Sequence, residues 1–370
     1  LSAAPHHRSS ASSAGCERAR LLGRLVGAMV NTPTKVAAAR DGFAEMLPGD
    51  QERSRLLVSR FEGAKQAAQF YGRRPRRFFL LPADAPLAGN AKRIHLVRHG
   101  EGHHNVWRAS ETAAGRTPYA KRGNMGEVPG ELHDPHLTAQ GRHEAELAHA
   151  AGSQCKPQLL VTSPLRRAVE TLQIVFRDAV AAGVPALAHE LCREQFRGPD
   201  PSIYDSRKAR SQLVQEFPGI NFSSYVLPED RGARQSGAVE VAGDDPLWWH
   251  SGSPFGTCEG GLHEVAMVEN AWGFLSWLMA RPEREIAVAT HSLFLLALYH
   301  GTLEPEKGGF FSAPQVFHTA ELRSVVVVER DAPQAPGREL LAWAPALVGP
   351  GLLHHDRAAE RSRSPRRVVE

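Results

Sequence analysis

Residues 94–105 read IHLVRHGEGHHN, and this stretch decides how the rest of the chain is interpreted. It begins with the mainly apolar run Ile94–Val97 and then changes abruptly to Arg98 and His99. This pattern predicts a buried strand that delivers two functional side chains at its C-terminal end. In open α/β sheets, ligands bind at that end of the strands.

Two later runs end in the same way. Leu159–Thr162 is followed by a serine and a proline, which suit the N-cap and first position of a helix and predict a helix start at Ser163. This start places Arg167 in the first helical turn. Ile286–Thr290 is followed directly by His291. The pattern therefore predicts that two histidines and at least two arginines converge beyond one edge of a sheet.

These residue types suit the binding and transfer of a phosphoryl group. A neutral imidazole nitrogen, as on His99, can act as a nucleophile and divide a difficult transfer into two easier steps. Phosphoryl transfer also needs charge stabilisation around the equatorial oxygens. Arg98 and Arg167 can each offer two parallel N–H donors to phosphate, a geometry that lysine does not match. His291 supplies a further donor.

The chain resembles the histidine phosphatase superfamily, in its phosphoglycerate-mutase-like branch. The resemblance covers roughly residues 93–330 and is carried by motifs in the family's order: Arg98-His99-Gly100-Glu101 with Asn105, Leu137-Thr138-Ala139-Gln140-Gly141, Ser163-Pro164-Leu165-Arg166-Arg167-Ala168 with Thr171, and Thr290-His291-Ser292. It implies an α/β three-layer sandwich, in which helices cover both faces of a mainly parallel sheet.

The resemblance also implies the roles of the core residues. His99 is the residue that becomes phosphorylated, and Arg98, Arg167 and His291 surround the phosphate. Asn105 matches an asparagine that lies beside the pocket in many family members. The family uses no cofactor for this chemistry, and we expect no metal. The expected partner is a small phosphorylated substrate.

Two further segments are assigned by resemblance. Leu137–Gly141 packs beside the nucleophile strand in the family, so a structural role is expected for it. Asp205–Lys208 resembles a subgroup of plant, fungal and protist mutase-like proteins, in which Arg207 lies near the substrate entrance. This second assignment rests on fewer residues than the core motifs.

A leaving alkoxide needs a proton, so a carboxylic acid is expected to reach the pocket. The family usually supplies a glutamate from a segment after the second motif, and here Glu190–Gly198 occupies that place. Glu194 is the preferred general acid. Glu190 is the alternative, and an exposed loop charge at position 194 is the competing interpretation.

Three functions stay open from the sequence. The first is a phosphomonoesterase that hydrolyses a phosphorylated metabolite through phospho-His99, and the second is a phosphoglycerate-mutase-type phosphoryl transfer. The family's mutases carry a Trp-Asn pair after the Arg-His-Gly motif. The matching region of this chain, Gly102–Trp107, lacks that pattern, and this departure favours hydrolysis. The third is a non-catalytic phosphate-binding module. It is disfavoured because all the core pocket residues are intact.

Composition narrows the class of protein. Hydrophobic residues make up 42% and charged residues 23% of the chain, as in ordinary globular proteins. The net charge of +4 and the pI of about 9.0 fit anionic substrates without indicating nucleic acid. No apolar run approaches the roughly 18 residues of a membrane span. His103 and His104 lack clustered carboxylates or cysteines, so they are interpreted as loop residues without a metal. Oligomeric state is left open.

The chain divides by composition into four parts. Residues 1–50 form a basic arm, either disordered or an organellar targeting segment. Residues 51–78 form an accessory helix and a basic linker, 79–333 the catalytic domain, and 334–370 a basic tail that is disordered at its end. The four cysteines are widely spaced, which favours a reducing, cytoplasmic setting. From Trp107 to Pro135 no period is sustained, and a long loop is expected.

Overall fold

The computed structural model describes residues 48–70, 76–115, 128–194, 203–228, 234–236, 239–241 and 262–331. The expected N-terminal arm and C-terminal tail lie outside these residues, apart from the start of α2. The strands are β1 (Arg76–Leu81), β2 (Lys92–Arg98), β3 (Leu159–Thr162), β4 (Ala186–His189), β5 (Asn221–Tyr225), β6 (Arg234–Ser236), β7 (Val239–Val241), β8 (Glu285–Thr290), β9 (Leu303–Pro305) and β10 (Leu322–Asp331).

Helices fill most of the segments between these strands. They are α2 (Pro48–Phe70), α3 (His103–Ala113), α4 (Ala139–Gly152), α5 (Arg166–Val175), α6 (Arg177–Ala181), α7 (Arg210–Glu216), α8 (Leu262–Ala280) and α9 (Ser292–Gly301), with short 3₁₀ turns η2 (Gly130–Leu132), η3 (Glu190–Cys192) and η4 (Ile203–Asp205). The accessory helix expected within residues 51–78 corresponds to α2.

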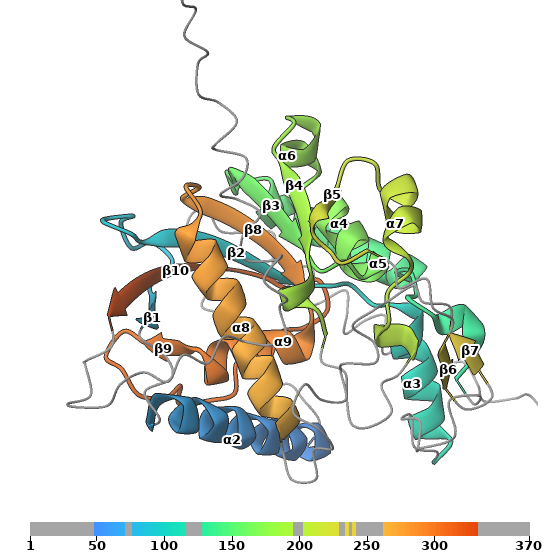
Figure 1. Ribbon diagram of the computed structural model, residues 1–370, viewed down its shortest axis with the longest axis horizontal. Coiled ribbons are helices and arrows are strands. Elements are labelled where there is room, and N and C mark those ends of the chain that lie inside the picture. Colours follow the sequence, from blue (N-terminus) through green and yellow to red (C-terminus); the bar gives the residue numbers. More distant parts are fainter. Residues whose placement is uncertain are drawn as a thin grey trace, which may run out of the picture. The chain divides into compact units, whose positions relative to one another are not determined.

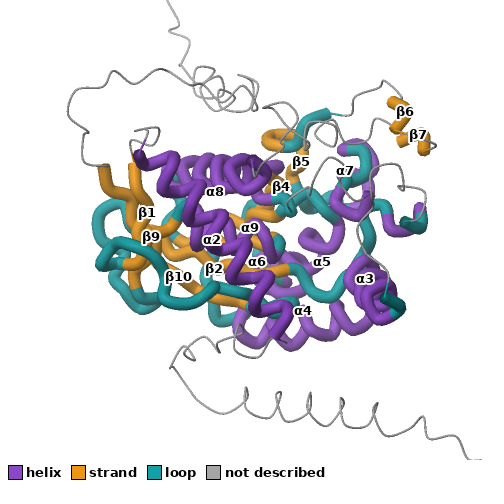
Figure 2. The backbone as a smooth tube through the Cα atoms, turned by 90° about the horizontal axis from the view of Figure 1, so that it is seen from below, coloured by secondary structure: helices purple, strands orange, loops and turns teal. Residues whose placement is uncertain are grey.

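One eight-stranded sheet, in the order β5-β4-β3-β8-β2-β10-β1-β9, organises the molecule (Figure 1). β10 is antiparallel to both of its neighbours, and the other pairs are parallel. The β6–β7 pair forms a separate small sheet (Figure 2). The predicted mainly parallel sheet is confirmed.

Alternating strand residues face two hydrophobic layers. In β8, Ile286 and Val288 pack in the layer that contains α2, α8 and α9 residues. Ala287 and Ala289 face the opposite layer, which contains residues of α4, α5 and α7. Because both faces are covered, the strands read as continuous apolar runs, as expected of a buried parallel sheet. The three-layer α/β fold expected from the sequence is therefore present.

Leu137–Gly141 packs against the backbone that follows β2. Thr138 is the N-cap of α4, with its hydroxyl accepting from Gly141 N, and its own N–H donates to Glu101 O at 2.9 Å. A Cβ on Gly141 would lie only 2.0 Å from Glu101 O, so this position requires glycine. The structural role expected for this motif is confirmed.

Three local expectations are corrected. α5 begins at Arg166 with Leu165 as N-cap, because the Ser163 hydroxyl accepts from Leu165 N and caps the turn before the helix. The segment expected to be a loop from residue 107 begins with most of α3. Arg77, expected in a linker, lies in β1 and forms an ion pair with Glu304.

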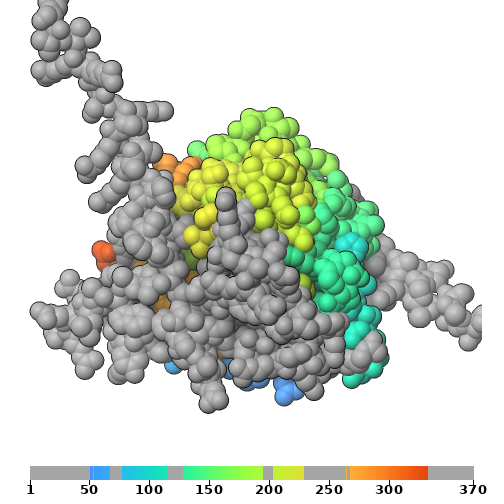
Figure 3. Space-filling model, turned by 45° about the vertical axis from the view of Figure 1, so that its right-hand side comes forward, coloured from blue at the N-terminus to red at the C-terminus, as the bar shows by residue number. Residues whose placement is uncertain are grey.

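A smaller hydrophobic cluster joins α3 to the turns η2 and η4. It contains Val128, Leu132 and Tyr204, with Trp107 packed against it. Figure 3 shows the yellow surface of residues 203–228 beside the green surface of the preceding segments. Within the part of the chain that the structure describes, no helix is long and apolar enough to span a membrane.

Candidate active site

The site lies at the carboxyl ends of three adjacent strands. β2, β8 and β3 pair in parallel so that Arg98 aligns with Thr290 and Thr162 aligns with Ala289. His99 follows β2, and its N–H donates to Thr290 O at 2.9 Å. The three sequence motifs that end in these residues are therefore brought together by the sheet, as predicted.

The His99 ring is oriented by its own backbone. Its Nδ1 lies 2.7 Å from the Gly100 carbonyl oxygen, which can only accept, so Nδ1 carries the proton. Burial, followed by the charges of Arg167 and Arg98, holds the pKa of His99 well below its usual range. His99 is therefore neutral at pH 7. Its Nε2 keeps the lone pair that a nucleophile needs.

His291 lies beside His99, with ring centroids 5.0 Å apart. Its Nε2 is 2.8 Å from the Ser163 hydroxyl. A hydroxyl that donates to Nε2 leaves the ring proton on Nδ1, where it is available as a donor. Burial, then the nearby Arg167 charge, lowers the pKa of His291 well below its usual range. A neutral imidazole N–H thus lies next to the candidate nucleophile.

Two arginines belong to the same site. Arg98 lines the pocket, and its Nη1 donates to Phe317 O at 2.7 Å. Arg167 is fully buried, with Nη1 donating to Tyr204 O at 2.7 Å and Nη2 to Asp205 Oδ1 at 2.8 Å. These hydrogen bonds use only some of the N–H groups of each guanidinium. Each arginine therefore retains N–H groups that can donate to an anion.

Several buried nitrogen atoms on the side chains around His99 have no hydrogen-bond partner among the described residues. They are Arg98 Nε, Arg167 Nε, His104 Nδ1 and His291 Nδ1. An unsatisfied buried polar group costs about 1–3 kcal/mol, and these nitrogen atoms are available to an acceptor. An anion with several acceptor oxygens fits the two arginines and His291.

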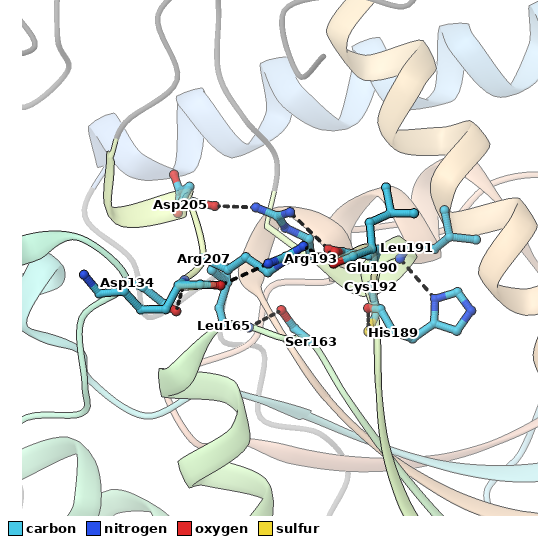
Figure 4. Close-up of polar contacts among 12 residues, drawn as sticks. Asp134, Ser163, Leu165, His189, Glu190, Leu191, Cys192, Arg193, Asp205 and Arg207 are labelled. Atoms are coloured by element: carbon cyan, nitrogen blue, oxygen red, sulfur yellow. Dashed lines mark hydrogen bonds and ion pairs between the residues drawn. The ribbon is translucent and has the colours of Figure 1, made fainter. Parts of the chain in front are cut away.

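The two candidate acids occupy different environments. Glu194 lines the pocket, and one of its carboxylate oxygens accepts from the Ser292 hydroxyl at 3.3 Å. Glu190 is buried, and its oxygens accept from Arg207 Nε at 2.9 Å and Arg193 Nη1 at 3.0 Å (Figure 4). Glu190 is not among the described residues that line the pocket.

The two predicted substrate-binding residues separate in the structure. Asn105 lines the pocket, and its side-chain oxygen accepts from Gly102 N at 2.9 Å. Arg207 is fully buried, and its guanidinium donates to Glu190, Lys208 O and Leu227 O. It is not among the pocket-lining residues that the structure describes. The contacts of Arg207 place its guanidinium among buried groups, and a position near the substrate entrance stays a prediction.

His104 and Arg108 line the pocket, but the sequence analysis did not identify them as site residues. His104 was expected in a loop, yet it is buried on α3, with its ring 5.6 Å from that of His99 and stacked on Tyr204 at 5.3 Å. A Cβ on Gly102 would lie 2.8 Å from His104 Nδ1, so glycine is required there. Residues 104, 105 and 108 are spaced so that a helix brings them to one face. A helix predicted at this position would therefore have identified them as neighbours.

The pocket-lining turn η4 was also missed. Tyr204 and Asp205 both line the pocket, and no periodic pattern in the sequence pointed to them. Among the described residues there is no group of three or more histidine, cysteine or carboxylate side chains that could hold a metal ion.

Comparison with known families agrees with this arrangement. Residues 94–203 match the model of the histidine phosphatase superfamily (branch 1). The matched segment contains His99 and Arg167, whose side chains the sheet brings together with His291. This segment of the chain is similar to the histidine phosphatase superfamily.

Relatives with a related name are found in Arabidopsis thaliana. Phosphoglycerate mutase-like protein 1 is 27% identical over 277 residues, which cover 65% of this chain and 82% of the relative. A second phosphoglycerate mutase-like protein is 28% identical over 275 residues, covering 65% and 85%. Among solved structures, the ecdysone phosphate phosphatase of Bombix mori in complex with tungstate is 16% identical, with a TM-score of 0.35 and coverage of 67% and 96%. A likeness of that size carries no information on activity.

Proposed function

We propose that this protein is a phosphomonoesterase that hydrolyses a small phosphorylated metabolite through a phosphohistidine intermediate on His99. The observation that supports this proposal best is the state of His99. Its ring is neutral, is oriented by a backbone carbonyl and lies among buried arginine and imidazole N–H groups. A fixed tautomer with a free Nε2 lone pair supplies the nucleophile. The surrounding donors supply the stabilisation of the equatorial oxygens that phosphoryl transfer requires.

In the first step, His99 Nε2 attacks the phosphorus atom and the bond to the ester oxygen breaks. The leaving oxygen takes a proton from Glu194, whose position in the pocket makes it the candidate acid. In the second step, the Glu194 carboxylate takes a proton from water, whose oxygen attacks the phosphorus. The bond to His99 Nε2 then breaks, which releases inorganic phosphate and restores both side chains.

Arg98, Arg167 and His291 hold the transferred phosphoryl group in this proposal. Their N–H groups surround His99, and the arginine forks suit phosphate oxygens. Because all three act before and during the transfer, they contribute positioning and charge stabilisation. Asn105 lies at the same pocket and contacts the substrate edge.

A mutase is the second candidate function, because the relatives from Arabidopsis thaliana are named phosphoglycerate mutase-like proteins. A mutase returns the phosphoryl group to its substrate at another position, so no inorganic phosphate accumulates. The region Gly102–Trp107 lacks the Trp-Asn pair that the family's mutases carry after the Arg-His-Gly motif. This departure favours hydrolysis.

The test measures inorganic phosphate released from a panel of phosphomonoesters, without added metal, by the wild type and by His99→Ala. We expect release by the wild type and none by the variant. His103→Ala is the matched control, because His103 is exposed and lies four residues further along the chain. A positional isomer of the substrate without phosphate release would favour the mutase. No turnover of any ester by a folded wild type would overturn both candidates.

A further inference from the structure

Asp205 is a pocket-lining carboxylate that the proposed reaction does not use. Its Oδ1 accepts from Arg167 Nη2 at 2.8 Å, and the preceding carbonyl, of Tyr204, accepts from Arg167 Nη1 at 2.7 Å. The side chain of Arg167 is 0% exposed and that of Asp205 is 9% exposed. One short turn, η4, therefore holds both terminal nitrogens of a guanidinium that α5 carries.

The turn η4 is itself anchored by buried charges (Figure 4). Arg193 Nη2 donates to the Asp205 carbonyl at 2.9 Å, and Arg193 Nη1 donates to Glu190 at 3.0 Å. The second oxygen of Glu190 accepts from Arg207 at 2.9 Å. Residues of the described segments 128–194 and 203–228 are thus connected by hydrogen bonds between fully or almost fully buried groups.

Asp134 connects Lys208, in the segment that follows η4, to the start of α5. Its Oδ1 accepts from Arg166 N and its Oδ2 accepts from Lys208 N, each at 3.0 Å. Asp134 is fully buried and has a φ of 51°. This carboxylate fixes the separation between the helix that carries Arg167 and the segment that carries Asp205.

We propose that Asp205 is a positioning residue, which fixes the orientation of the Arg167 guanidinium and so aims its remaining N–H groups at the phosphate. This inference rests on the proposed phosphate site. A guanidinium has five donors in a rigid fork, and an acceptor on one side determines where the other donors point. Arg167 Nε, the buried donor without a partner among the described residues, remains available to the ligand.

The negative charge of Asp205 is essential to this role. An uncharged acceptor still forms a hydrogen bond to the Arg167 cation, but it lacks the attraction between two opposite charges that the ion pair has. A misplacement of about 1 Å at a reacting group can cost roughly 100-fold in rate. Loss of the charge should therefore affect Arg167 less than loss of the whole side chain.

The experiment compares Asp205→Asn and Asp205→Ala with the wild type. We expect kcat/KM to fall about tenfold for Asp205→Asn and about 100-fold for Asp205→Ala, and the Kd for inorganic phosphate to rise in the same order. Asp178→Asn is the matched control, because Asp178 is an exposed carboxylate whose ion pair with His149 lies outside the pocket. The control should stay within about twofold of the wild type.

A double-mutant cycle with Arg167→Lys separates positioning from general support of the fold. If Asp205 acts through Arg167, Asp205→Asn should cost less than about threefold in the Arg167→Lys background, because the group that it orients has been removed. Equal losses in both backgrounds, or an unchanged Kd for phosphate in a folded Asp205→Asn protein, would overturn the inference. Asp205→Asn is nearly isosteric and keeps the test available if Asp205→Ala does not fold.

Measuring phosphate binding separately from hydrolysis allows this inference and the proposed function to fail independently. Hydrolysis by the wild type combined with no effect of Asp205 would reject the positioning role and leave the function intact. If the wild type hydrolyses no ester but its phosphate binding depends on Asp205, the proposed function is rejected and the positioning role is kept. A folded wild type that neither binds phosphate nor hydrolyses an ester would reject both.

Discussion

The two walls of the pocket are built in different ways. One wall consists of residues that end or follow β2 and β8, among them the pocket-lining Arg98 and His99, with the buried Arg167 and His291 close to His99. The other consists of residues on α3 and η4, among them His104, Arg108 and Tyr204. Strand pairing fixes the backbone of the first wall, as in the bond from His99 N to Thr290 O. Side-chain packing and buried charges hold the second.

This difference separates chemistry from recognition. We expect residues of the strand wall to determine the rate of phosphoryl transfer for every substrate. Residues of the helix wall other than Asp205, which acts through Arg167, should instead determine which substrate is used, because the leaving group extends away from His99. The first three predictions below test this separation, and equal effects on both walls would contradict it.

The largest effect should come from the strand wall. His291→Ala removes a neutral imidazole whose ring lies 5.0 Å from that of His99. Loss of one preorganised donor to a transition-state oxygen costs about 10²–10³-fold in kcat. Steady-state kinetics with several phosphomonoesters should show a loss of this size for each of them. His318→Ala, at an exposed histidine, is the control, and a loss below tenfold would remove His291 from the transfer step.

Glu194 lies between the walls, so its effect should depend on the leaving group. Glu194→Gln cannot deliver a proton, and general acid catalysis contributes about 10²–10⁴-fold where the alkoxide leaves poorly. We expect a loss of about 100-fold for alkyl phosphates and less than threefold for p-nitrophenyl phosphate. Glu146→Gln changes an exposed carboxylate and serves as the control. Equal losses on both classes of ester would exclude Glu194 as the general acid.

The helix wall gives a smaller, substrate-dependent effect. His104→Ala removes a buried ring that stacks on Tyr204, so the wall loses its shape near the leaving group. We expect kcat/KM to fall about tenfold, or roughly 1.4 kcal/mol, and the ranking of substrates to change. His103→Ala, at the adjacent exposed position, should change neither. Identical ranking by His104→Ala and the wild type would mean that this wall does not select substrates.

The same contrast explains what the sequence could predict. A buried parallel strand shows as an apolar run, so β2, β3 and β8 and the residues that follow them could be found from residue types alone. His104 escaped because α3 begins directly after a glycine-containing turn, and no apolar period marked it. Asp205 and Arg207 could not be placed, because their positions depend on buried ion pairs with Arg167 and Glu190 that are distant in sequence.

The protonation state of the three histidines offers a direct test of the buried site. Burial, and then the charge of Arg167, lowers the pKa of His99, His104 and His291 well below 6.5. We expect their ring carbon and proton NMR shifts to stay constant between pH 7 and pH 5.5. The urea-unfolded protein should titrate near 6.5 in the same range. Titration of His99 near pH 6.5 in the folded protein would contradict a permanently neutral nucleophile.

These lowered pKa values also determine how stability depends on pH. The unfolded histidines bind protons below about pH 6.5, whereas the buried rings do not, so the free energy of unfolding must decrease as the pH falls below 6.5. His189, whose pKa burial lowers to about 3, acts in the same direction. Each such ring contributes about 1.4 kcal/mol per pH unit in this window. His104→Phe removes one of them, so the slope measured by urea unfolding should become shallower by about that amount, while an unchanged slope would mean that His104 titrates alike in both states.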